Sequence, residues 1–100
     1  MNLGILVTSD EHLDHVIGLV KAATSKALNV TLFCMDRGTL LLEDPKIKQL
    51  CKLDGVEISL CRHSAEGLGV DTNNIQKDIV CGSQFNNAMM NHDADKVIVL

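Results

Sequence analysis

Apolar residues along the chain form short runs that alternate with segments of helical periodicity. The short runs are rich in aliphatic and β-branched residues, which predicts buried strands. These strands are expected at residues 2–7, 30–35, 56–61, 78–81 and 96–100. Between them, apolar residues recur at steps of three and four, which is typical of helices with one buried face. These helices are expected at residues 10–28, 45–53 and 62–67, and in a segment that begins after Ser83.

This alternation predicts a three-layer α/β/α sandwich with a mainly parallel five-stranded sheet, because short connections leave room only for strand-to-helix crossovers. Thr8 and Glu11 have the spacing of a capping box at the start of the first helix. Asp44 before Pro45 predicts the start of the second helix, and Ser83 is a suitable cap for the last one. We expect residues 1–100 to form a single domain.

The composition of the chain argues against several classes of function. Nine basic residues stand against 13 acidic ones, and the chain has two Phe and no Tyr or Trp. Neither a basic field nor stacking side chains are available, so we expect no binding to nucleic acid. No apolar run approaches the roughly 18–20 residues of a membrane span, and the N-terminus lacks a signal-peptide pattern, so we expect a cytoplasmic protein that binds no membrane. A chain of 100 residues has little spare stability, which favours a homo-oligomer.

The four cysteines stand at positions 34, 51, 61 and 81, and none belongs to a Cys-x-x-Cys motif. In a reducing compartment they are expected as free thiols rather than a disulfide framework. Parallel sheets bind ligands beyond the carboxyl ends of their strands, and Cys34, Cys61 and Cys81 are expected there. Cys51 lies on the apolar face of the second predicted helix and is interpreted as core.

Cys61 is the main candidate for chemistry, because it ends a strand where a helix begins at once. Unpaired backbone N–H groups at a helix start favour an anion, and Arg62 and His63 add positive charge. Such surroundings lower the pKa of a thiol and make the thiolate available. The alternative is that Cys61 is the last inward residue of a buried strand and is inert.

Other residues are secondary candidates for the same sheet edge. Cys81 is followed by Gly82, which allows close approach of a ligand, and by Ser83, which can open a helix. Cys34 is interpreted as packing or as a second thiol at the rim, and Ser64 belongs to the electrostatic setting of Cys61.

The chain shows no strong motif for a metal or a cofactor. His12 and His15 stand three residues apart on one predicted helix, but a zinc site normally combines two such pairs. Neither GxGxxG nor GxxxxGK[ST] occurs. We therefore expect no bound metal and no cofactor.

The stretch GVEISLCRHSAEGLGV at residues 55–70 resembles the DsrE-like family of small sulfur-relay proteins, which includes TusD-type subunits. The last segment, with Ala-Asp-Lys-Val at residues 94–97, is similar to the final helix and strand of that family. The resemblance implies a DsrEFH-like fold and a cysteine that carries sulfur as a persulfide, at the position of Cys61. It also implies sulfur donor and acceptor proteins as partners, and a homotrimer or homohexamer.

The sequence thus predicts a sulfur carrier or sulfurtransferase with Cys61 as acceptor, and whether it is an enzyme stays open. A first alternative is a thiol redox protein in which Cys61 forms a disulfide with Cys34 or Cys81. A second alternative is a binding module without catalysis that uses the same edge. Phe85, Met89 and Met90 are candidates for a subunit contact or for the core.

Overall fold

The computed structural model describes residues 1–75 and 77–100. The strands are β1 (Asn2–Val7), β2 (Asn29–Cys34), β3 (Val56–Cys61), β4 (Val80–Gly82) and β5 (Lys96–Val99). The helices are α1 (Leu13–Ser25), the 3₁₀ helix η1 (Asp36–Glu43), α2 (Pro45–Leu50), α3 (Arg62–Gly67) and α4 (Gln84–Asp93). The alternation of strands and helices predicted from the hydrophobic pattern is confirmed.

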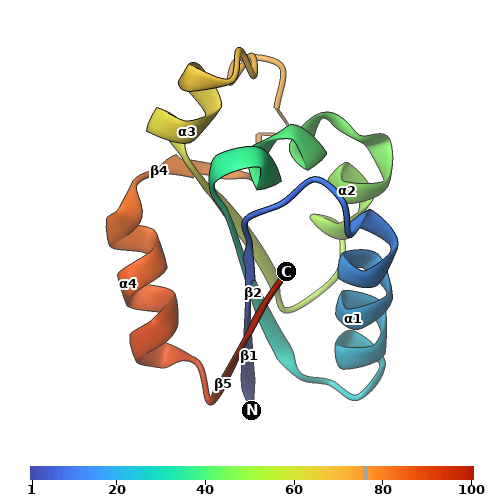
Figure 1. Ribbon diagram of the computed structural model, residues 1–100. Helices are drawn as coiled ribbons and strands as arrows, with labels where there is room; N and C mark the ends of the chain where they lie inside the picture. Colours follow the sequence, from blue (N-terminus) through green and yellow to red (C-terminus); the bar gives the residue numbers. More distant parts are fainter. Residues whose placement is uncertain (76) are drawn as a thin grey trace.

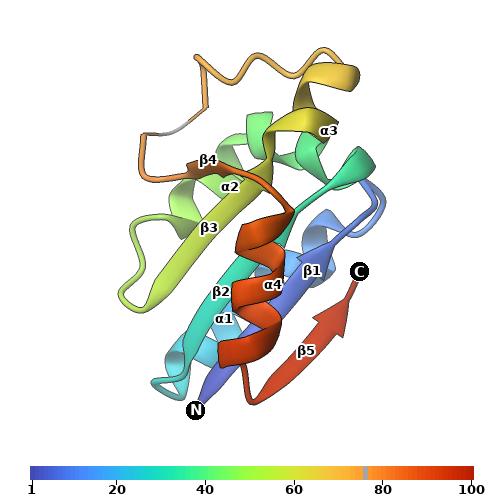
Figure 2. The same cartoon turned by 90° about the vertical axis from the view of Figure 1, so that its left-hand side faces the viewer.

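All strand pairs are parallel, and the strand order is β4-β3-β2-β1-β5. Figure 1 shows the sheet between two helical layers, with α4 on one face and α1 and α2 on the other. Figure 2 looks onto α4, which crosses the middle of the sheet and leaves β3 uncovered on one side and β5 on the other. The predicted three-layer α/β/α sandwich is confirmed.

The core is divided between the two faces of the sheet. Side chains along β2 point alternately to the two faces of the sheet. Leu32 therefore belongs to the larger cluster beneath α1 and α2, whereas Phe33 faces α4. The smaller cluster consists of Phe33, Cys61 and Met90. Met90 is therefore core, whereas Phe85 and Met89 of the same helix stay exposed.

The start of the first helix differs from the prediction. Leu13 is its first residue, and His12 is the N-cap without a side-chain cap. Thr8 and Glu11 form no capping box, because the backbone N–H of Thr8 donates to the carbonyl oxygen of Leu100 at 2.7 Å. That bond draws the chain after β1 toward β5 rather than into a helix.

Further boundaries differ from the sequence analysis: α1 ends at Ser25 rather than at residue 28, and α2 ends at Leu50 rather than at residue 53, so Cys51 lies outside the helix. Residues 36–43 form a 3₁₀ helix that the apolar pattern does not reveal. The fourth strand begins at Val80 rather than at residue 78, so Cys81 is its central residue and not its last. The predicted cap of the last helix is confirmed: Ser83 accepts a hydrogen bond from the N–H of Phe85 at 3.2 Å, and Asn86 completes a capping box. Within the described ranges, no helix combines the length and apolar character required to cross a membrane.

Candidate functional site

Cys61 is both the last residue of β3 and the N-cap of α3, so no loop separates strand from helix. Only 5% of the residue is exposed, and it packs in the cluster with Phe33 and Met90. Cys61 nevertheless lines an open pocket of about 920 Å³ at the carboxyl end of the sheet. The pocket combines residues of three segments: Met35, Asp36, Cys61, Arg62, His63, Ser64, Glu66, Gly82, Ser83, Gln84 and Phe85.

Polar groups of α3 and α4 influence the Cys61 thiol. Burial raises the pKa of Cys61, but the Ser64 hydroxyl and backbone N–H, the Gln84 side-chain amide and the His63 backbone N–H lower it. The lowering contributions prevail, so the pKa lies below the ordinary value for cysteine. Such an environment favours the thiolate, which is the nucleophilic form of cysteine.

The electrostatic setting differs in detail from the one predicted. Arg62 lines the pocket, but its guanidinium lies 4.0 Å from the Glu66 carboxylate and both side chains are largely exposed. An exposed pair of this kind contributes little to stability. His63 acts on Cys61 through its backbone N–H rather than through the imidazole. Hydrogen-bond donors, and not the charges of these two side chains, lower the pKa of the thiol.

Gln84 is a residue of the pocket that the sequence analysis missed. It follows the Ser83 cap as the first residue of α4, and its Nε2 atom also lies 3.7 Å from the sulfur of Met35. The chain passes from β4 over the end of β3 to reach α4, and this crossing brings Gln84 to Cys61. The capping residue was recognisable in the sequence, but the proximity of its neighbour to Cys61 depends on the strand order.

The other two sheet-edge cysteines lie away from this pocket. Cys34, Leu60 and Cys81 are register partners on neighbouring strands and pack against the core beneath α1 and α2. Cys34 is fully buried, and burial raises its pKa to about 12. Cys61 follows Leu60 on β3, so its side chain points to the opposite face of the sheet. Thiols that point apart cannot be bridged without backbone movement, so the geometry gives no support to a disulfide of Cys61 with Cys34 or Cys81.

Cys51 lies just beyond α2 as its C-cap and is partly buried against the larger core cluster. Burial raises the pKa of this thiol, and the nearby charge of Asp78 raises it further. Cys51 is therefore poorly ionised as well as distant in the fold from the Cys61 pocket, whose lining does not include it.

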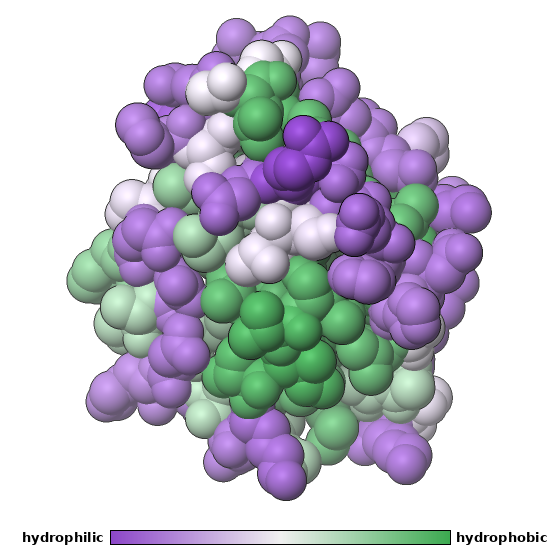
Figure 3. Space-filling model, in the orientation of Figure 1, coloured by the Kyte–Doolittle hydropathy of each residue, from purple (hydrophilic) through white to green (hydrophobic). Residues whose placement is uncertain are grey.

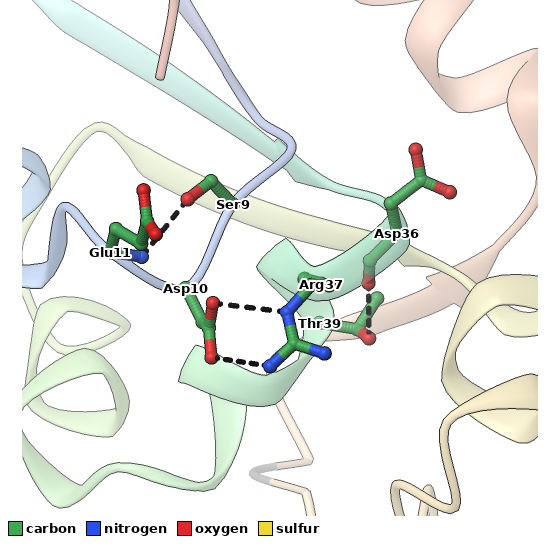
Figure 4. A network of polar contacts seen from close by, with 6 residues as sticks. All are labelled: Ser9, Asp10, Glu11, Asp36, Arg37 and Thr39. Carbon is green, nitrogen blue, oxygen red and sulfur yellow. Dashed lines mark hydrogen bonds and ion pairs between the residues drawn. The ribbon is translucent and has the colours of Figure 1, made fainter.

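A network beside the pocket fixes the loop that follows β2 (Figure 4). The Arg37 guanidinium donates two hydrogen bonds to Asp10, at 3.2 and 3.1 Å, which ties the loop after β1 to η1. Asp36 adopts a left-handed conformation with φ of 49°, and its carbonyl oxygen accepts a hydrogen bond from the Thr39 hydroxyl at 2.8 Å. Asp is one of the few non-glycine residues that adopt this conformation readily, and the bond from Thr39 helps to hold the turn. Asp36 itself lines the Cys61 pocket.

The two histidines of the first helical segment lie close together, with ring centroids 5.8 Å apart. Across residues 1–75 and 77–100, no three His, Cys, Asp or Glu side chains are grouped in a way that could hold a metal ion. The pair therefore stands on the surface without a third ligand among these residues.

We expect Ser64→Ala to slow the alkylation of Cys61 at pH 7 by roughly threefold to tenfold, because the variant lacks the hydroxyl that lowers the pKa of the thiol. The pKa of the thiol rises in this variant, so the rate should recover at higher pH. The measurement is the rate of iodoacetamide labelling of Cys61 from pH 5 to 10, read by peptide mass spectrometry. Ser25→Ala, at the end of α1, is the control, and an unchanged profile for Ser64→Ala would contradict the assignment of the donor.

The fold is similar to that of solved proteins. One is the ychN protein from E. coli, whose crystal structure superimposes with a TM-score of 0.77 at 20% sequence identity and covers 100% of both chains. This match supports the DsrE-like resemblance at the level of the fold. No family model matches the sequence. No curated protein sequence matches it either.

Proposed function

We propose that the protein carries sulfane sulfur as a persulfide on Cys61 and transfers it between a donor and an acceptor protein. One observation supports this proposal above the others. Cys61 is the N-cap of α3 and lines an open pocket together with Ser64 and Gln84, and polar groups of these residues hold the pKa of its thiol below the ordinary value in spite of burial. A buried cysteine that only fills space needs no such polar groups. The DsrE-like fold is compatible with this role.

The transfer consists of two exchange steps. The Cys61 thiolate attacks the outer sulfur of a donor persulfide R–S–SH, a new S–S bond forms, and the donor leaves as the thiolate R–S⁻. An acceptor thiolate then attacks the outer sulfur of Cys61–S–SH, and Cys61 leaves as a thiolate. Only one sulfur atom moves, and no external oxidant or reductant is consumed.

The same donors serve both steps. Ser64 and Gln84 stabilise negative charge on Cys61 before it attacks and again when it leaves, because each hydrogen bond to an ionised group is stronger than one to a neutral group. A lower thiol pKa also makes Cys61 a better leaving group. The pocket gives the second sulfur atom room to extend from a residue that is itself buried.

The test is the mass of the protein after incubation with glutathione persulfide. We expect the wild type to gain about 32 Da, which corresponds to one sulfur atom, and Cys61→Ser to gain none. Cys51→Ser and Cys81→Ser are matched controls, since both residues are partly exposed cysteines outside the pocket, and both variants should load normally. Undiminished loading of Cys61→Ser would disprove the proposal.

The proposal includes assembly into a homo-oligomer in the cytoplasm, as expected from the sequence. The surface supports it: β5 is an edge strand that pairs only with β1, and Val99 is 61% exposed on it. Figure 3 shows a cluster of apolar side chains at the place where Figure 1 draws β5. Exposed apolar edges of sheets are usually covered by another chain or element. Light scattering that gives the mass of one chain would contradict this part of the proposal.

A further inference from the structure

The face of the sheet that carries α4 is only partly covered. Between α4 and the strands β2 and β3 lies an open groove of about 810 Å³. Thr31, Glu57 and Ser59 of β2 and β3 line it from the sheet, and Met89 and Asp93 line it from α4. Figure 2 shows β3 beside α4 on the face of the sheet that is turned to the viewer.

The charged residues that line the groove are all acidic. Glu57, Asp78 and Asp93 line it, whereas no lysine or arginine of the described ranges does. A concave surface with charges of one sign attracts ligands of the opposite sign and raises their rate of association. The charge therefore selects for a basic occupant.

The groove also continues toward the candidate site. Its boundary with the Cys61 pocket is the capping box of α4, in which Asn86 accepts a hydrogen bond from the Ser83 N–H at 3.0 Å. Phe85 lines the pocket, and Met89, one helical turn further on, lines the groove. These two side chains are 69% and 43% exposed, so an apolar strip joins the two hollows.

We propose that this groove docks the protein that exchanges sulfur with Cys61, through a basic segment of that partner with apolar side chains. The inference rests on the proposed function. Acidic residues in the groove bind the cationic side chains, and Phe85 and Met89 bind the apolar ones. A partner held along α4 in this way presents its own thiol to the pocket at the start of the same helix. The groove thus decides which thiols reach Cys61.

The test uses thiol exchange with synthetic peptides and needs no sulfane sulfur. Two cysteine peptides have equal length and leucine content, but one carries lysines and the other glutamates, and both are activated as thiopyridyl disulfides. The Cys61 thiolate attacks the peptide sulfur, a mixed disulfide forms, and thiopyridone leaves, which is followed by absorbance. The reaction rate measured with Cys61→Ser is subtracted to remove the contribution of the other cysteines.

We expect the basic peptide to react about tenfold faster than the acidic one at low salt, and the difference to shrink as salt screens the charges. The variant E57Q/D78N/D93N should lose most of this preference. The control E11Q/D14N/E43Q, with the same change in net charge outside the groove, should keep it.

Equal preferences in the groove variant and in the control variant would overturn the proposal. So would a groove variant whose oligomer mass falls while its peptide preference is unchanged, because the groove would then hold a second copy of the chain. Loss of preference only in the groove variant supports docking. Persulfide loading is measured separately, so failure of the docking site can be told from failure of Cys61 as a carrier.

Discussion

Replacing Phe33 with alanine is expected to lower the free energy of unfolding by about 3–5 kcal/mol. Phe33 is fully buried at the centre of the small cluster between the sheet and α4. Removal of the Phe33 ring leaves a cavity between the sheet and α4. Because α4 is the helix that covers this face, it could fill the cavity only by shifting, and the shift would expose Met90. Urea unfolding followed by circular dichroism measures the loss.

The chain contains its own control for this substitution, because its only other phenylalanine is Phe85. That ring is 69% exposed, so Phe85→Ala should change the free energy of unfolding by less than about 0.5 kcal/mol. The same chemical change is thus made at a buried and at an exposed position. Equal losses for the two variants would show that the burial described for this face is wrong.

Gly38→Ala is expected to cost about 3 kcal/mol of stability and to disturb the Cys61 pocket. A Cβ atom at this position would overlap the carbonyl oxygen of Val7, which is main chain and cannot rotate away. The neighbouring backbone must therefore shift. This backbone includes Met35 and Asp36, which line the Cys61 pocket. We therefore expect both a lower midpoint of urea unfolding and a changed rate of Cys61 alkylation.

Gly18→Ala is the matched control. Gly18 lies inside α1, and an added Cβ would meet no atom within 4 Å. Alanine is favoured over glycine inside a helix by about 0.8–1 kcal/mol, so this variant should be more stable than the wild type. A Gly38→Ala protein as stable as Gly18→Ala would contradict the close contact between η1 and the end of β1.

The junction at Cys61 could be predicted from the sequence because its signals are local. Apolar residues end at Cys61, helix-forming residues begin at Arg62, and the structure places β3 and α3 at these bounds. Parallel strands then put the cysteine at the edge where helices start. The predicted pocket residues Arg62, His63, Ser64, Gly82 and Ser83 do meet around Cys61.

The rest depends on contacts between distant segments. The presence of Gln84 in the same pocket as Cys61 requires that β4 pair with β3, which no local pattern specifies. Cys34 and Cys81 point away from Cys61 because of the register in which β2 and β4 pair with β3. A shift of this register by one residue would turn their side chains to the other face of the sheet. The hydrogen bond between Thr8 and Leu100 is also absent from any local pattern, because the two residues lie at opposite ends of the sequence.

The opposite orientation of the cysteines has a consequence for damage by peroxide. A thiolate attacked by peroxide becomes a sulfenic acid, which is rescued when a second thiol condenses with it. Cys34 and Cys81 point to the face of the sheet opposite Cys61, so neither thiol can serve Cys61 as an internal resolving group. Recovery of an oxidised Cys61 therefore depends on thiols supplied from solution, and without them a second equivalent of peroxide oxidises the sulfenic acid to irreversible sulfinic acid.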